Sequence, residues 1–104
     1  MAAILIVDNY QYRSRLLYKK LADDGYGVSI IDDIDMLPSD FNDSQFDLAL
    51  FSFELDEFDT SEVLSDIKKK NPNFPVLYYT LKSYDSIIGL KETISMVLRT
   101  GDVK

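Results

Sequence analysis

Polar side chains follow three apolar stretches of this chain, at the points where strands of a parallel sheet would end. In an open α/β sheet these ends meet at one edge, and chemistry takes place just beyond it. The polar residues are Asp8 and Asn9 after the run 3–7, Ser52 after the run 48–51, and Thr80 after the run 75–79. The residue at the end of the most apolar run is thus a neutral hydroxyl, not an acid.

Hydrophobic patterning predicts the elements that position these side chains. The predicted strands are 3–8, 28–31, 47–52 and 75–80, and the predicted helices are 11–23, 33–44, 59–70 and 85–99. Residues 48–51 are uniformly apolar, as expected of a strand covered on both faces. Strands and helices alternate with short connections, which predicts right-handed βαβ units and a parallel sheet in a single domain over 1–104.

Local signals mark the ends and faces of the helices. Leu16, Leu17 and Leu21 are predicted to face inward from the first helix, and Gly25 to end it in a left-handed conformation. Pro38 makes the helix at 33–44 the least regular one. Asp59 has the spacing of a capping box and is predicted to open the third helix.

The order and spacing of these motifs resemble the receiver domain of bacterial response regulators. The resemblance lies in Ile4-Leu5-Ile6-Val7-Asp8-Asn9, the Gly25-Tyr26 turn, Phe46-Asp47-Leu48, Asn71-Pro72 leading to Pro75-Val76, and Thr80. It implies an α/β, flavodoxin-like, three-layer sandwich with a parallel sheet in the order 2-1-3-4. Receivers have a fifth strand and a fifth helix, whereas only one helix follows the fourth strand here. The chain is therefore expected to lack the fifth strand and one helix.

The resemblance assigns a role to each polar position. Receivers take a phosphoryl group, with Mg²⁺, on an Asp at the end of the third strand, and that position falls on Ser52. Asp8 matches one of the two metal-holding acids, and Asn9 replaces the other. Glu54 stands where receivers often ligate the metal through a main-chain carbonyl, and Thr80 matches the hydroxyl that follows the phosphoryl group in switching. Since serine cannot form an acyl phosphate, phosphorylation of Ser52 is not expected.

Other charged residues near this edge are interpreted as structural. Lys82 is predicted to be an exposed loop lysine and not a substitute for the missing lysine of a fifth strand. Asp56 and Asp59 are predicted to lie in a solvated acidic loop with one helix cap, not to accept a phosphoryl group. Asp8 keeps two interpretations: an acid that caps the next helix or accepts loop N–H bonds, or a weak ligand of Mg²⁺. No catalytic residue and no cofactor are predicted.

Three tyrosines follow or lie in the fourth strand. Tyr78 and Tyr79 are expected on opposite faces, and Tyr84 comes shortly after. If the fifth strand is missing, the fourth becomes a sheet edge with unpaired backbone groups. We expect these tyrosines to form an interaction surface for a protein partner or a second copy.

Composition excludes several classes of function. The 104 residues include no histidine and no cysteine, so disulfides, thiolate metal sites and histidine bases are ruled out. The net charge is −7, and no Lys or Arg lies between Lys20 and Lys68, which argues against nucleic-acid binding. The sequence carries no signal-peptide pattern or membrane-spanning run, and a cytoplasmic location is expected.

These observations predict a receiver-like signalling module, not an enzyme, that acts through protein–protein contact without phosphorylation. One alternative is a working receiver that uses Mg²⁺ and a non-standard acid. Another is the N-terminal input domain of a longer transcriptional regulator.

Overall fold

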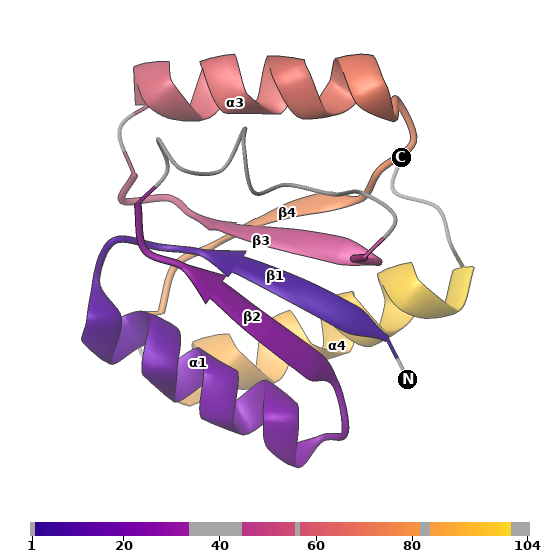
Figure 1. Ribbon diagram of the computed structural model, residues 1–104. Helices are drawn as coiled ribbons and strands as arrows, with labels where there is room; N and C mark the ends of the chain where they lie inside the picture. The colour runs from indigo at the N-terminus through magenta and orange to yellow at the C-terminus, as the bar shows by residue number, and fades with distance from the viewer. Residues whose placement is uncertain (1, 34–44, 56, 82–83, 101–104) are drawn as a thin grey trace.

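The computed structural model describes residues 2–33, 45–55, 57–81 and 84–100 (Figure 1). Four parallel strands form one sheet in the order β2-β1-β3-β4, as predicted. The strands are β1 (Ala3–Val7), β2 (Gly27–Ile31), β3 (Leu48–Ser52) and β4 (Val76–Tyr79), and the helices are α1 (Gln11–Asp23), α3 (Glu57–Lys70) and α4 (Tyr84–Thr100). The helix expected at 33–44 falls almost wholly outside the described residues.

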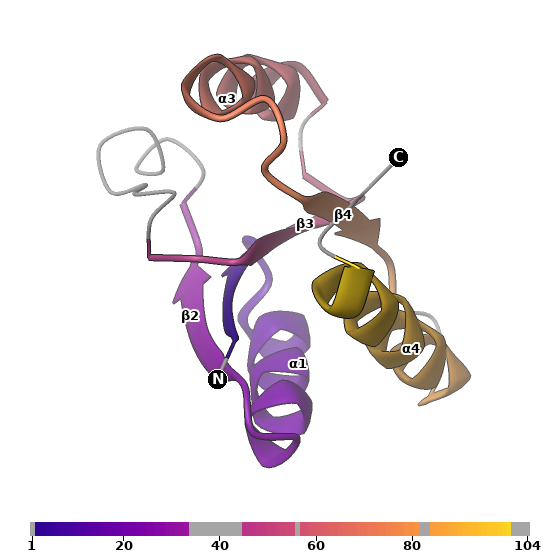
Figure 2. The same ribbon diagram turned by 90° about the vertical axis from the view of Figure 1, so that its right-hand side faces the viewer.

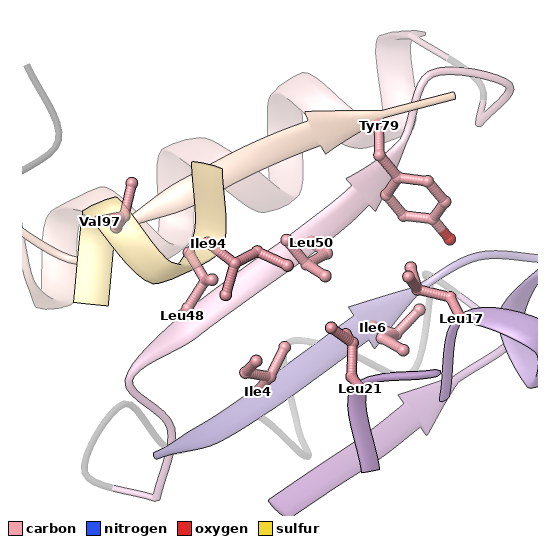
Figure 3. Close-up of a cluster of buried hydrophobic side chains, with 9 residues drawn as sticks. All are labelled: Ile4, Ile6, Leu17, Leu21, Leu48, Leu50, Tyr79, Ile94 and Val97. Atoms are coloured by element: carbon pink, nitrogen blue, oxygen red, sulfur yellow. The ribbon is translucent and has the colours of Figure 1, made fainter. Parts of the chain in front are cut away.

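The helices cover both faces of the sheet, which makes the predicted three layers. Helix α3 lies on one face, and α1 and α4 lie together on the other (Figures 1 and 2). The core is correspondingly divided in two. Leu5, Val7 and Phe51 pack towards α3, whereas Ile4 and Ile6 pack towards α1 and α4 (Figure 3). Every residue of β3 is buried, because this strand has neighbours on both sides and helices on both faces.

The helix that follows β4 lies on the same face as α1. Its apolar stripe faces inward as predicted, with Ile87, Ile94 and Val97 buried. Ile94 and Val97 contact the cluster that also contains Leu48 and Tyr79 (Figure 3). This placement leaves β4 as the last strand of the sheet among the described residues.

Two local predictions for the helices are wrong, and one is confirmed. Leu16 is exposed while Leu17 and Leu21 are fully buried, because only one stripe of α1 meets the sheet. Helix α3 begins at Glu57, so Asp59 lies inside its first turn and does not precede it as a cap. Gly25 ends α1 with a φ of 96°, the left-handed conformation that glycine adopts without steric cost.

Candidate functional site

The sheet brings the predicted polar residues to one edge. The parallel register pairs Val7 with Phe51 and Ser52 with Tyr79, so β1, β3 and β4 end at nearly the same level. Asp8 and Thr80 follow the first and last of these strands directly, and Ser52 ends the central one. The predicted gathering of these side chains is therefore present.

Asp8 is fully buried and is held by a cation from the neighbouring helix. Nε of Arg13 donates to Oδ2 of Asp8 at 2.6 Å, and Nη2 donates to Oδ1 at 2.6 Å. The backbone N–H of Tyr10 donates to Oδ1 at 3.0 Å, and the hydroxyl of Tyr79 donates to Oδ2 at 2.5 Å. Both carboxylate oxygens thus accept two hydrogen bonds each, one of them from the guanidinium in a bidentate pair.

The ionisation of this group follows from those contacts. Burial alone would raise the pKa of Asp8, but the hydrogen bonds from Arg13, Tyr79 and Tyr10 outweigh it, and the pKa lies below the ordinary value of an aspartate. The bond to Asp8 raises the pKa of Arg13. Burial, together with donation to Asp8, raises the pKa of Tyr79. At neutral pH the group is therefore an ionised carboxylate, a guanidinium and a neutral phenol.

The carboxylate of Glu54 links Ser52 to Thr80. The hydroxyl of Ser52 donates to Oε2 of Glu54 at 2.7 Å, and the hydroxyl of Thr80 donates to Oε1 at 3.0 Å. The backbone N–H of Glu54 donates to Oγ of Ser52 at 3.1 Å, and this bond fixes the turn after β3. The hydrogen bond from Ser52 is the main reason that the pKa of Glu54 lies below its ordinary value.

A weaker ion pair connects the two groups. Nη1 of Arg13 lies 3.7 Å from Oε2 of Glu54, so one guanidinium serves both carboxylates. The result is a single network over three strand ends and one helix. Among the described residues, no buried side-chain nitrogen or oxygen lacks a hydrogen-bond partner.

The network fits poorly with a divalent cation at Asp8. Mg²⁺ requires ligand oxygens in near-octahedral geometry, and it keeps several waters of its own. Both oxygens of Asp8 are occupied, and Arg13 already places a positive charge between Asp8 and Glu54. No group of three acidic side chains able to hold a metal ion occurs in the described ranges. The oxygens of Asp8 that could hold a metal are therefore already bound to Arg13, Tyr79 and Tyr10, and one guanidinium faces two carboxylates.

The sequence analysis does not single out Arg13, which is one of several basic residues of α1. One signal could have found it. Arg13 lies in the first turn of α1, where a cation opposes the helix dipole, and that turn contains no acid to compensate it. A basic residue in such a place implies a partner elsewhere, and the nearest acid in sequence is Asp8.

The prediction that Tyr79 belongs to an exposed interaction surface is wrong. Its side chain is 3% exposed, lies in the core beneath α1 and α4, and points its hydroxyl at Asp8 (Figure 3). Tyr78, on the opposite face as predicted, is exposed. Asn9 is exposed beside the site. Lys82, Asp56 and the side chains of Asp59 and Tyr84 lie outside what the structure describes.

Solved structures with a similar fold are receiver domains. The response regulator protein TrrA from Thermotoga maritima, in complex with Mg²⁺–BeF, has a TM-score of 0.78 and 23% identity over 93% of this chain and 99% of its own. A chain in the crystal structure of histidine kinase ThkA in complex with TrrA has a TM-score of 0.74 and 23% identity, with 94% and 99% covered. A CheY-like receiver domain protein from Methanospirillum hungatei has a TM-score of 0.74 and 22% identity, with 96% and 95% covered.

The chain therefore has the receiver fold, of the flavodoxin-like kind, in a form with four strands and three helices among the described residues. No family model matches the sequence, and no curated protein matches it. None of the described helices is long and apolar enough to cross a membrane.

Proposed function

We propose that this chain is a receiver-like signalling module that works through protein–protein contact and without phosphorylation. Its fold is that of response-regulator receivers, which supports a place in two-component signalling. Its site departs from phosphoryl chemistry at the position that matters most. The acceptor position holds Ser52, whose phosphate would be a stable ester and not a labile acyl phosphate.

One observation carries the proposal: Arg13 binds Asp8 through two hydrogen bonds of 2.6 Å inside the fold. In a receiver that uses Mg²⁺, the acid after the first strand must be free to hold the metal. A bidentate guanidinium on a buried carboxylate is among the strongest pairings in proteins, and displacing it would leave Arg13 without its anion. The guanidinium of Arg13 thus balances the charge of Asp8, as a bound metal would in a working receiver.

The second carboxylate supports the same conclusion. Glu54 accepts hydrogen bonds from Ser52 and Thr80, so the acceptor and switch positions are already tied together. In a working receiver, the hydroxyl at the position of Thr80 follows the phosphoryl group. Here the hydroxyl of Thr80 binds the carboxylate of Glu54, which is always present. This contact would hold the site in one state without a phosphodonor.

A signalling module that does not transfer phosphoryl groups must act by binding. Receiver domains bind proteins, and a structurally similar regulator has been solved in complex with its histidine kinase. The proposal therefore includes a protein partner or a second copy, no nucleic acid and no lipid. The absence of cysteine from the sequence fits a place in the bacterial cytoplasm.

The test is exposure to a phosphodonor. The chain is incubated with Mg²⁺ and acetyl phosphate, or with Mg²⁺ and beryllofluoride, and examined by intact mass and by amide NMR. TrrA, which has been solved with Mg²⁺–BeF, is the positive control. We expect no mass gain and no shift of the amide signals of Asp8, Ser52 or Thr80.

A mass gain of one phosphate that hydroxylamine removes would reveal an aspartyl or glutamyl phosphate and would overturn the proposal. The matched variant is Ser52→Asp, which restores the acid at the acceptor position only. Because Arg13 still occupies Asp8 in that variant, we expect it to remain unphosphorylated.

A further inference from the structure

Strand β4 is the edge of the sheet formed by the described residues, and no described strand pairs with its outer side. In a parallel strand, the N–H and C=O of one residue point to the same side, and successive residues alternate. The carbonyl of Pro75 accepts a bond from the N–H of Ala49, and the carbonyl of Tyr79 accepts one from the N–H of Phe53, so the backbone groups of these two residues point towards β3. Val76, Tyr78 and Thr80 therefore point their backbone groups away from the sheet, where the described residues place no further strand.

An aromatic ridge runs along this edge. Phe53 is 66% exposed and Tyr78 is 41% exposed, and their rings stack with centroids 5.2 Å apart. A hollow of about 360 Å³ lies on the α3 side of Tyr78, and another of about 310 Å³ lies on its α4 side. Exposed stacked aromatic rings between two hollows are typical of a contact surface, because rigid rings bury much area at small entropic cost.

The described residues of this surface carry no charge, although the chain as a whole has a net charge of −7. Among the described residues that line the two hollows, there is no Asp, Glu, Lys or Arg. No charged residue occurs from Val76 to Leu81, so the strand itself does not use charge, one of the usual devices against pairing with another chain. Two copies can therefore meet here without bringing their excess acids face to face.

Charges do flank the two ends of the edge, with opposite signs. At the carboxyl end, Glu54 accepts a bond from Thr80. At the amino end, Nζ of Lys68 donates to the carbonyl of Phe74 at 2.8 Å, two residues before Val76. An antiparallel arrangement of two such edges sets the acidic end of each against the basic end of the other.

We propose that the occupant of this edge is a second copy of the same chain, paired antiparallel through β4 about a two-fold axis at Tyr78. Tyr78 then exchanges two backbone hydrogen bonds with Tyr78 of the second copy, and Val76 faces Thr80 on either side. All three outward residues of each strand are used, and the two sheets become one sheet of eight strands. This inference rests on the proposed function, because an interface that needs no phosphorylation must exist in the unmodified chain.

The pairing also brings the aromatic ridges of the two copies, Phe53 and Tyr78 of each, into contact. Directly opposed residues lie closest in an antiparallel pair, so the two Tyr78 rings meet on the α3 side with Phe53 beside each. An isologous contact of this kind closes on itself and gives a dimer, not a fibre. The hollows beside Tyr78 leave room for the second edge to approach.

The first test is analytical ultracentrifugation without any phosphodonor, at concentrations up to about 1 mM. The wild type is expected to form a dimer, and Tyr78→Lys to weaken it about tenfold or more, because two like charges would meet at the axis. Tyr12→Lys is the matched control, since Tyr12 is an exposed tyrosine on α1, and it should dimerise as the wild type does. Circular dichroism confirms that each variant is folded.

The second test uses the absence of cysteine from the chain. Opposed residues of a hydrogen-bonded antiparallel pair have Cα atoms about 5.5 Å apart, within the range that a disulfide spans. With diamide as the two-electron oxidant, Tyr78→Cys should therefore give a covalent dimer, and Tyr12→Cys should give far less. When the disulfide forms, the two thiols give two protons and two electrons to diamide, which is reduced to its hydrazine.

The outcomes separate this inference from the proposed function. A wild type that stays monomeric, a dimer that Tyr78→Lys leaves intact, or equal cross-linking of both cysteine variants overturns the β4 pairing. None of these results tests the absence of phosphorylation, which is tested by the mass measurement with a phosphodonor. A chain that gains a phosphate overturns the proposed function whatever its oligomeric state.

Discussion

Arg13→Met removes the cation from Asp8 and leaves the rest of the site in place. Methionine keeps most of the apolar stem of arginine, so the substitution removes the guanidinium and little of the packing. Asp8 would retain its bonds from the N–H of Tyr10 and the hydroxyl of Tyr79. It would lose the two bonds of 2.6 Å that neutralise it.

The expected cost follows from burial. Asp8 is 0% exposed and the Arg13 side chain is 14% exposed, so the pair belongs to the buried class. Removing one partner of such a pair costs about 3–5 kcal/mol, because the other charge is left without compensation. The two remaining hydrogen bonds to Asp8 place the expected loss near the lower end, at about 3 kcal/mol. A domain of this size has a free energy of unfolding of about 5–15 kcal/mol, so the loss is readily measurable.

The assay is urea unfolding at neutral and acidic pH, followed by circular dichroism. Without Arg13 the pKa of Asp8 should rise, since burial is then opposed by fewer hydrogen bonds. The destabilisation should accordingly be large at pH 7 and smaller near pH 4, where a neutral Asp8 is less costly to bury. Arg15→Met, an exposed arginine on the same helix, is the matched control and should change stability little.

Two results would refute this reasoning. The first is a loss below about 1 kcal/mol at pH 7, the range of exposed ion pairs, because the Arg13–Asp8 pair would then contribute no more than a surface contact. The second is an equal loss in Arg15→Met. The double variant Arg13→Met with Asp8→Asn removes both charges, and it should recover part of the stability that Arg13→Met loses.

Two further predictions concern the same group. Tyr79→Phe removes a buried hydroxyl that donates to an ionised Asp8, so it should lower the free energy of unfolding by about 1.5–3 kcal/mol. The measurement is urea unfolding, and an unchanged midpoint would contradict the contact. The pKa of Asp8 is lower in the folded chain than in the unfolded one, so its stabilisation is complete above the unfolded value of about 3.9 and is lost as pH falls through the folded value. Unfolding followed from pH 6 to pH 2 should therefore show a shallower acid decline in Asp8→Asn than in the wild type, and equal slopes would contradict this assignment.

Much of the architecture could be read from the chain because it depends on short-range periodicity. The uniformly apolar residues 48–51 of β3 predicted a strand covered on both faces, and the stripe through Ile87 and Ile94 predicted the buried side of α4. Gly25 marked the end of α1 by its conformational freedom. The position of Ser52 at the edge of the sheet followed from where its strand ends. In each case the signal lies within one element.

The hydrogen bonds and ion pairs of the site depend on the tertiary structure. Alternation along β4 assigned Tyr78 and Tyr79 to opposite faces, but it could not show that α4 would pack beside α1 and bury Tyr79 against Asp8. Likewise, the resemblance placed the main chain of Glu54 near the site, but it did not show that the side chain of Glu54 would meet Arg13. Only the meeting of β1, α1 and the turn after β3 sets a guanidinium between two carboxylates. Local sequence patterns determine which elements form, whereas the charges that neutralise one another depend on how those elements pack.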